Sequence, residues 1–167
     1  ASAASHNNHW GVPLTLSRMP QDADYGIFEI GMNHPGEITP LAKMVRPHVA
    51  IITTVQAVHL GYFKSLDEIA AAKAEIFDGL ESNGTAILNR DNHYFDFLTK
   101  RALAAGADRI ISFGTDENAE SRLESLNPNS EGSVVKATIL GETRTYKIVA
   151  PGTHLVTNGL AVLAAVK

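Results

Sequence analysis

The chain has 167 residues, of which 44% are hydrophobic, so it is long and apolar enough for one domain with a buried core. Its net charge of −4 provides no basic surface for nucleic acid, and it has no apolar run near the ~18 residues that a membrane span needs. Cysteine is absent, which excludes disulfide bonds and thiolate metal sites.

Strand and helix patterns alternate through the first two thirds of the chain. The expected elements, in chain order, are a strand at 25–32, a helix at 36–45, a strand at 48–55, a helix at 65–80, a strand at 85–89, a helix at 94–106 and a strand at 109–114. Strands that alternate with helices of about 10–15 residues are typical of βαβ units. We therefore expect an α/β fold with a mostly parallel sheet flanked by helices.

The last third of the chain has a different pattern. Residues 132–140 and 143–150 alternate apolar and polar side chains and are separated by Gly141 and Glu142, which predicts a β-hairpin. Residues 127–132, NPNSEG, predict an exposed loop, and residues 154–167 predict a final helix. We therefore expect the chain to form a small antiparallel ribbon after the parallel strands and before the last helix.

The helix expected at 65–80 carries a lysine on its apolar face. At about 100° per residue, Lys73 falls near the centre of an arc of roughly 100° that holds the large apolar side chains. These are Leu66, Ile69, Ile76, Phe77 and Leu80. Ser65 and Glu68 form the S-x-x-E pattern of a capping box, which predicts where the helix begins.

Two interpretations of Lys73 are open from the residues alone. Its stem can pack on apolar surface while the ammonium reaches solvent. Alternatively the ammonium is buried and tends to lose its proton, because burial disfavours the charged form. A neutral amine reacts with carbon dioxide to give a carbamate, and that carbamate has the oxygen ligands that Mg²⁺ prefers.

Polar side chains also occur where the first two expected strands end. Glu29 lies inside an apolar run just before Gly31, and His59 follows the strand expected at 48–55. Each is either an ordinary strand-end or loop residue or part of a site, because ligands of open α/β sheets bind beyond the carboxyl ends of the strands. Glu29, His59 and a carbamylated Lys73 would form an acceptable ligand set for Mg²⁺.

Several common catalytic and phosphate-binding motifs are missing. The sequence has no G-x-x-x-x-G-K-[ST] and no G-x-G-x-x-G, so it contains no recognisable phosphate-binding loop. It also lacks H-x-H and H-E-x-x-H spacings, which argues against a histidine-based metal hydrolase.

Taken together, five segments resemble the Mur ligases, which build the stem peptide of peptidoglycan. They are NNHWGVPLTL (7–16), FEIGMNHPGEI (28–38), HVAIITTVQAVHLGYFKSLDEIAAAKAEIF (48–77), AILNRDN (86–92) and PGTHLVTNGLAVLAA (151–165). They cover nearly the whole chain in order, and AKAEIF after an HL pair at this spacing is quite specific. The Asn-Asn-x-x-Gly-x-Pro beginning favours the type of ligase that adds D-alanyl-D-alanine to a UDP-MurNAc-tripeptide.

The resemblance implies that residues 1–167 form the central, ATP-binding domain of a three-domain ligase. That domain has a P-loop NTPase-like fold, here without the P-loop. The chain begins ASAASHNN and ends inside an expected helix. We therefore expect a piece of a longer protein, from which the N-terminal substrate domain, the P-loop and the C-terminal domain are absent. We expect this piece alone to be inactive and to self-associate through an exposed sheet edge, and the complete protein to be a monomer.

The resemblance also implies roles for individual residues. Lys73 matches a lysine that is typically carbamylated and helps to position Mg²⁺, and Glu29 and His59 match the magnesium-binding pair. These three are the expected catalytic and metal-binding residues.

Four further residues match binding positions of the family. His154 and Asn158 match positions near the nucleotide. Asn7 and Asn8 match a segment near the UDP-sugar peptide substrate.

The implied activity is ATP-dependent amide-bond formation in the bacterial cytoplasm, with ATP and Mg²⁺ as cofactors. UDP-MurNAc-tripeptide and D-Ala-D-Ala would be the substrates, and an acyl phosphate the intermediate. Nucleic acid is not an expected partner. The alternatives are a sibling Mur ligase, a folylpolyglutamate-type ligase, or a non-catalytic relative that binds nucleotide.

Overall fold

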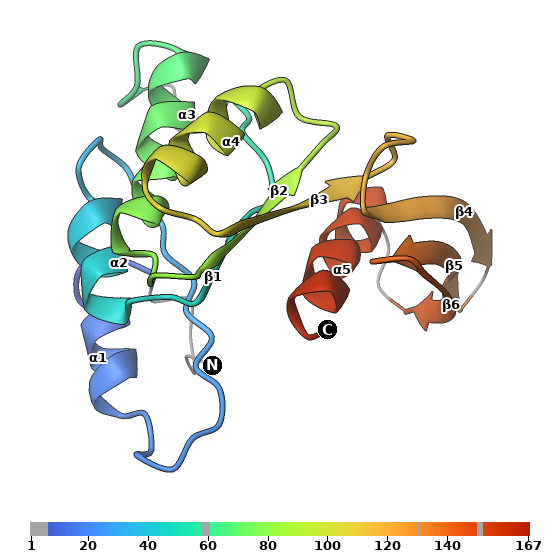
Figure 1. The fold of residues 1–167 in the computed structure, drawn as a ribbon, viewed down its shortest axis with the longest axis horizontal. Helices are drawn as coiled ribbons and strands as arrows, with labels where there is room; N and C mark the ends of the chain where they lie inside the picture. Colours follow the sequence, from blue (N-terminus) through green and yellow to red (C-terminus); the bar gives the residue numbers. More distant parts are fainter. Residues whose placement is uncertain (1–6, 58–60, 130, 150–151) are drawn as a thin grey trace.

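The computed structural model describes residues 7–57, 61–129, 131–149 and 152–167, and these form a six-stranded mixed sheet with helices on both faces (Figure 1). The strands, in sheet order, are β1 (Val49–Ile52), β2 (Thr85–Asn89), β3 (Arg109–Gly114), β4 (Ser121–Asn129), β5 (Gly132–Ile139) and β6 (Glu142–Ile148). The helices are α1 (Gly11–Ser17), α2 (Ile38–Val45), α3 (Leu66–Ala74), α4 (Phe95–Ala104) and α5 (Thr153–Ala165), with a 3₁₀ helix η1 (Glu75–Gly79) directly after α3. This confirms the expected α/β fold.

The sheet changes from parallel to antiparallel pairing at β4. Strands β1, β2 and β3 are parallel neighbours, whereas β4, β5 and β6 pair antiparallel. Strands β3 and β4 are parallel but pair at only two positions, where the end of β3 meets the beginning of β4. A short link joins them because β4 continues onward from β3 instead of returning to its start, which would require a longer crossover.

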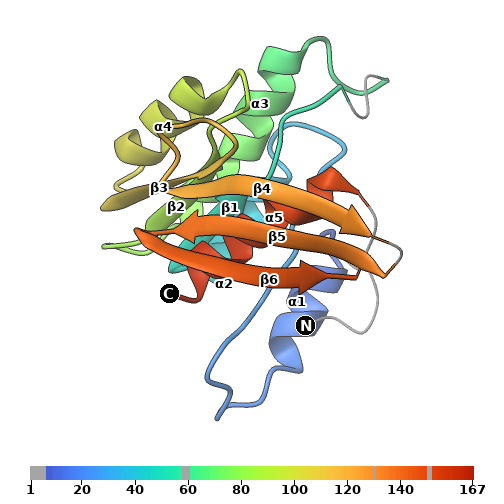
Figure 2. The same ribbon diagram turned by 90° about the vertical axis from the view of Figure 1, so that its right-hand side faces the viewer.

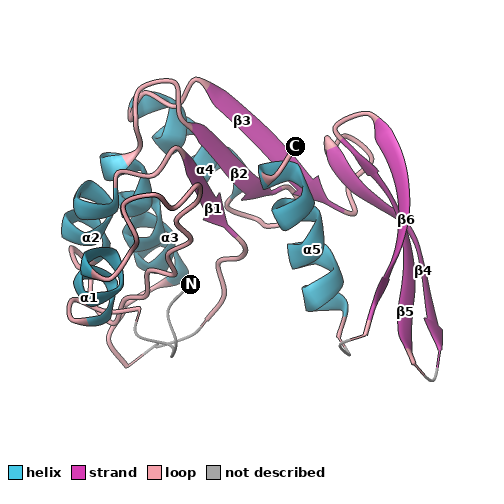
Figure 3. Ribbon diagram, turned by 90° about the horizontal axis from the view of Figure 1, so that it is seen from below, coloured by secondary structure: helices cyan, strands magenta, loops and turns pink. Residues whose placement is uncertain are grey.

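The sheet separates two hydrophobic cores. Helices α3 and α4 cover one face of β1–β3, while α5 lies between the other face and the ribbon of β4–β6 (Figure 3). Figure 2 shows that ribbon in front of α5. Successive side chains of a strand point to opposite faces. Ala86 and Leu88 accordingly pack on the α3–α4 side, and Ile87 packs on the α5 side.

The helix expected at 65–80 is confirmed, with a change of helix type inside it. The α-helical part ends at Ala74, and the 3₁₀ helix η1 continues the segment to Gly79. At its beginning, Glu68 N donates to Ser65 Oγ over 3.2 Å, as the capping box predicts. The Glu68 carboxylate accepts from the backbone N–H of Lys64 at 2.6 Å, one residue before the expected donor.

The strand expected at 25–32 is wrong. These residues run as a loop outside the sheet (Figure 1), and Tyr25 and Ile27 are 90% and 75% exposed. Within the described part of the chain, β1 pairs with β2 alone, and this segment does not pair with its other edge. An apolar, β-prone composition produces a strand only where a neighbouring strand supplies hydrogen bonds and a packed face.

The exposed loop expected at 127–132 is also wrong at its beginning. Strand β4 extends to Asn129, and Asn127, Pro128 and Asn129 pair with β5. The ribbon therefore has three strands where two were expected. The far half of β4 is exposed, so its polar residues carry no apolar alternation that would have marked a strand.

No helix in the described ranges is long and apolar enough to cross a membrane.

Candidate functional site

A hollow of about 510 Å³ opens at the carboxyl ends of β1 and β2. This is where open α/β sheets bind their ligands. Its lining comes from the segment after β1, the beginning of α3 and the segment between β2 and α4. The lining residues are Thr54, Val55, Gln56, Leu66, Asn89, Asp91, Asn92, His93 and Tyr94.

Two asparagines hold the wall of this hollow together. Asn89 Nδ2 donates to the carbonyl of Thr53 at 2.9 Å, which ties the end of β2 to the segment after β1. Asn92 Nδ2 donates to Thr54 Oγ1 at 3.2 Å and to the carbonyl of Val55 at 3.1 Å. The asparagine oxygens accept backbone N–H groups of their own loop, so both amides are committed to building the wall.

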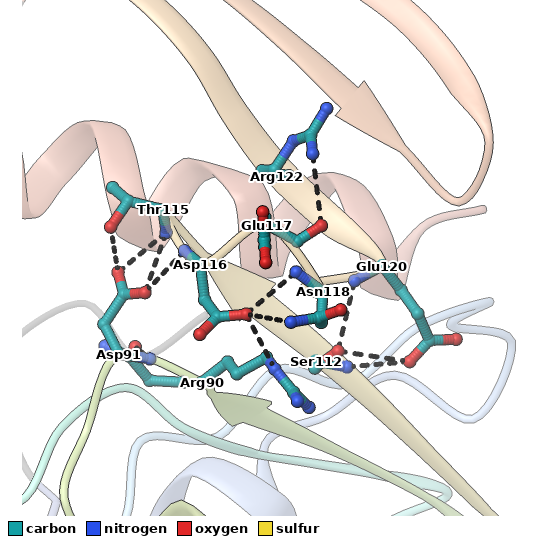
Figure 4. A network of polar contacts seen from close by, with 10 residues as sticks. Arg90, Asp91, Ser112, Thr115, Asp116, Glu117, Asn118, Glu120 and Arg122 are labelled. Carbon is teal, nitrogen blue, oxygen red and sulfur yellow. Dashed lines mark hydrogen bonds and ion pairs between the residues drawn. The ribbon is translucent and has the colours of Figure 1, made fainter.

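Asp91 fixes the loop between β3 and β4 to the same wall (Figure 4). Its carboxylate accepts the backbone N–H groups of Thr115 and Asp116 at 2.7 and 2.9 Å, and the Thr115 hydroxyl at 3.0 Å. The close approach requires Gly114, where a Cβ would lie 2.6 Å from Asp91 Oδ1. Hydrogen bonds to an ionised carboxylate are the stronger kind, so this loop is held firmly.

Arg90 adds an ion pair beside that loop. Its Nε lies 3.0 Å from Asp116 Oδ1, and its guanidinium carbon lies 5.0 Å from the centre of the Phe95 ring. The N–H of Asn118 and the Arg90 guanidinium both lower the pKa of Asp116, the first more strongly. The ion pair and the hydrogen bonds thus keep Asp116 ionised and fixed in place beside the hollow.

Lys73 lies partly buried on α3, on the helix whose apolar face was expected to carry it. It is half-buried on α3 between the buried residues Ala72 and Ala74, and burial lowers the pKa of its ammonium. Among the described residues, no side-chain hydrogen bond or ion pair of the Lys73 ammonium compensates for its desolvation. A lysine without such a partner gives up its proton more readily, which is the first condition for a carbamate.

Glu29 and Asn7 lie together, although their expected roles are different. Asn7 Nδ2 donates to Glu29 Oε1 at 2.8 Å, and the N–H of Gly31 donates to the Asn7 carbonyl at 2.7 Å. The Glu29 side chain is exposed, and its Oε2 accepts no hydrogen bond from the residues that the structure describes. Asn8 has a local role, since its Oδ1 accepts the N–H groups of Trp10 and Gly11 at the beginning of α1.

His154 and Asn158 occupy the first turns of α5 and share one side of that helix, four residues apart. Because α5 covers the opposite face of the sheet from α3, they do not lie beside Lys73 (Figure 3). His59 lies outside the described residues, three positions after Gln56, which lines the hollow. No group of three histidine, aspartate or glutamate side chains in the described ranges is arranged to hold a metal ion.

Three residues of the hollow, Asn89, Asp91 and Asn92, were not among the predicted site residues. The sequence does carry a signal for them, because N-R-D-N begins at the last residue of the strand 85–89. Polar residues at the end of a strand indicate a candidate ligand site, because open α/β sheets bind their ligands there. Their hydrogen-bond partners, which show that they build the wall, come from segments far away in the chain.

Comparisons with known proteins show which family the chain and its fold resemble. The profile of the Mur ligase middle domain matches residues 1–166. The UDP-N-acetylmuramoyl-tripeptide--D-alanyl-D-alanine ligase of Escherichia coli is 35% identical over 166 residues, which cover 98% of this chain and 36% of that protein. A crystal structure of MurF from Acinetobacter baumannii superimposes with a TM-score of 0.90 at 28% identity, over 98% of this chain and 35% of that one.

A more distant structure shares the fold. MurF of Thermotoga maritima, solved in complex with ADP, gives a TM-score of 0.73 at 24% identity over 99% of this chain and 37% of that one. The chain spans about a third of the length of these relatives.

Proposed function

The chain belongs to the Mur ligase family, matching its middle domain, and from this premise we propose that it is the ATP-binding domain of the ligase that adds D-Ala-D-Ala to UDP-MurNAc-tripeptide. One observation carries the proposal: a ligase of that name is 35% identical over 98% of this chain. The proposal extends to the domain organisation. An N-terminal substrate domain, a P-loop and a C-terminal domain would come from parts of the protein outside these 167 residues.

The proposed reaction joins a carboxylate to an amine at the expense of ATP. The terminal carboxylate of the tripeptide takes the γ-phosphoryl group, which gives an acyl phosphate and ADP. The amine of D-Ala-D-Ala then attacks the acyl carbon, inorganic phosphate leaves with the bonding electrons, and the amine loses its proton. Because the first step brings two anions together, positioning and charge neutralisation dominate its catalysis.

Lys73, Glu29 and His59 are the residues that we propose for Mg²⁺, as catalytic and metal-binding residues. The half-buried amine of Lys73, its lowered pKa and the exposed carboxylate of Glu29 fit this role. Bound there, Mg²⁺ would neutralise phosphate oxygens. Lys73 as a carbamate would hold the ion and would not act as a base.

The remaining predicted residues keep their proposed binding roles. We propose that His154 and Asn158 approach the nucleotide from α5, and that Asn7 and Asn8 approach the UDP-sugar peptide. For Asn7 this role is supported by its contact with Glu29, which places the substrate segment next to a proposed metal ligand. ATP and UDP-linked substrates place the reaction in the cytoplasm, and we expect the complete protein to act as a monomer.

The test is phosphate release by the complete protein that contains this chain. ATP, Mg²⁺ and UDP-MurNAc-tripeptide are supplied with and without D-Ala-D-Ala, and we expect release that depends on the dipeptide. Lys73→Ala should lower the rate by at least the ~10-fold that losing a metal-site partner costs. A short carboxylic acid should restore part of it, whereas Lys100→Ala, which changes an exposed lysine on α4, should leave the rate unchanged.

Other outcomes would reassign the protein. Phosphate release with a different amine would indicate a sibling ligase. The absence of release with every amine would indicate a nucleotide-binding relative. Equal rates for Lys73→Ala and Lys100→Ala would show that Lys73 is a surface lysine with a packed stem.

A further inference from the structure

The beginning of helix α2 is held by a glutamate that follows it by more than thirty residues. Glu75 Oε1 accepts the N–H of Gly36 at 2.6 Å, and its Oε2 accepts the N–H groups of Ile38 and Thr39 at 3.1 and 3.2 Å. Three backbone donors thus converge on one carboxylate. The first N–H groups of a helix have no partner within the helix, and a negative charge is stabilising there.

The residues beside α2 do not perform this task themselves. Glu37, at the N-cap position, makes no capping bond. Its carboxylate turns back and accepts the N–H groups of Asn33 and His34 at 2.7 and 3.2 Å. Glu75 therefore supplies the cap of α2 from a different part of the fold.

The segment from Glu29 to α2 depends on such contacts because it pairs with no strand among the residues that the structure describes. Asn7 binds it at Glu29 and Gly31, Glu37 folds the turn that follows, and Glu75 fixes its end. Of these three anchors, only Glu75 belongs to the helical segment that carries Lys73. It lies two residues after Lys73, a rise of about 3 Å along the helix.

We propose that Glu75 is a positioning residue that sets the place of Glu29 relative to Lys73, and so shapes the magnesium site. This inference rests on the proposed function, in which Glu29 and Lys73 bind the same ion. Glu75 and Lys73 point to different sides of the helix, because they are two residues apart. Glu75 thus acts through the loop that it holds and does not contact the ion.

The chain offers a matched control in Asp78. Its Oδ2 accepts the hydroxyl of Thr39 at 2.6 Å and so joins the same two segments. That bond ends on a side chain, whereas Glu75 binds the backbone that leads to Glu29. A variant of Asp78 therefore weakens the contact between η1 and α2 without releasing the turn at Gly36.

The test measures metal binding by the complete protein. Mn²⁺ is titrated in the presence of ADP and followed by electron paramagnetic resonance, so that no turnover is needed. Supporting residues around a metal site contribute about 10-fold or more to affinity. We expect Glu75→Gln to weaken Mn²⁺ binding about 10-fold and Asp78→Asn to change it less than 2-fold. Glu75→Asp keeps the charge but is too short for all three donors, and it serves if Glu75→Gln does not fold.

The outcomes separate this inference from the function on which it rests. Unchanged Mn²⁺ affinity in the folded Glu75 variants, or equal losses in Asp78→Asn, would overturn the positioning role and leave a simple helix cap. A wild-type protein that binds no Mn²⁺ would overturn it too. If Mn²⁺ binding weakens as expected but wild-type phosphate release does not depend on D-Ala-D-Ala, the positioning role stands and the ligase assignment fails.

Discussion

The contact between η1 and α2 leaves no room for a side chain at Gly79. A Cβ at this position would lie 2.6 Å from the backbone nitrogen of Lys43 and even closer to the carbonyl group of Ala42. These are main-chain atoms of α2, which cannot rotate away as a flexible side chain can. We therefore expect Gly79→Ala to force the two segments apart.

The size of the effect follows from this overlap. Normal carbon contacts need about 3.5–4.0 Å, so the helices must separate by roughly 1–2 Å. Overpacking of this kind costs about 1–3 kcal/mol, and the rigid neighbours place Gly79→Ala near the upper end. For a chain of this size, a loss of about 3 kcal/mol lowers the melting temperature by about 6–12 °C.

Gly159→Ala is the matched control with the opposite sign. Gly159 lies inside α5, where a Cβ would meet Ile148 Cδ1 at 3.4 Å and the Tyr146 hydroxyl at 3.8 Å, both ordinary contact distances. Alanine stabilises a helix interior by about 0.5–1 kcal/mol over glycine. Urea unfolding of the wild-type chain and both variants, followed by circular dichroism, measures the two changes. Equal stability of Gly79→Ala and the wild type would refute the close packing of η1 on α2.

Three further predictions concern charged side chains. Because burial lowers the pKa of Lys73, the folded chain binds fewer protons than the unfolded chain between that lowered pKa and the ordinary lysine pKa, so stability rises with pH in that window. In buffer free of carbon dioxide, Lys73→Met should abolish that rise in urea unfolding; a rise that persists would contradict the burial. Asp91→Asn should cost about 1–2 kcal/mol and accelerate amide hydrogen exchange at Thr115 and Asp116, whose N–H groups bind the carboxylate. Lys167 lies 3.0 Å from Glu142 and is the main cause of that carboxyl's lowered pKa, so Lys167→Ala should raise it in an NMR titration, and an unchanged value would show that Arg144 suffices.

Regular burial made much of the fold predictable from the sequence. Strands β1, β2 and β3 are covered on both faces and read as apolar runs, while α3 and α4 bury one side each. The segment 25–32 has the composition of a strand, but its conformation depends on a pairing partner, which no local pattern reveals. Strand β4 was missed for the opposite reason, because its pairing with β5 supports a polar sequence.

The candidate site was predictable to a similar extent. Periodicity placed Lys73 on the apolar face of its helix, and in the structure Lys73 is half-buried, with a pKa that burial lowers. The contacts of Asp91 and Glu75 join residues more than twenty positions apart, so no local pattern could reveal them. Their acidic side chains were visible in the sequence, whereas their partners depend on the tertiary fold.

The two cores separated by the sheet have a consequence for synthesis of the chain. Helices α3 and α4 are made between the strands that they cover, α3 between β1 and β2 and α4 between β2 and β3, so that face can close early. Ile87, Ile111 and Phe113, on the other face, are covered by α5, whose residues are made last. An apolar surface on β2 and β3 thus stays open to solvent until residues 153–165 are free to fold, which makes this the interval of greatest exposure to aggregation or chaperone binding.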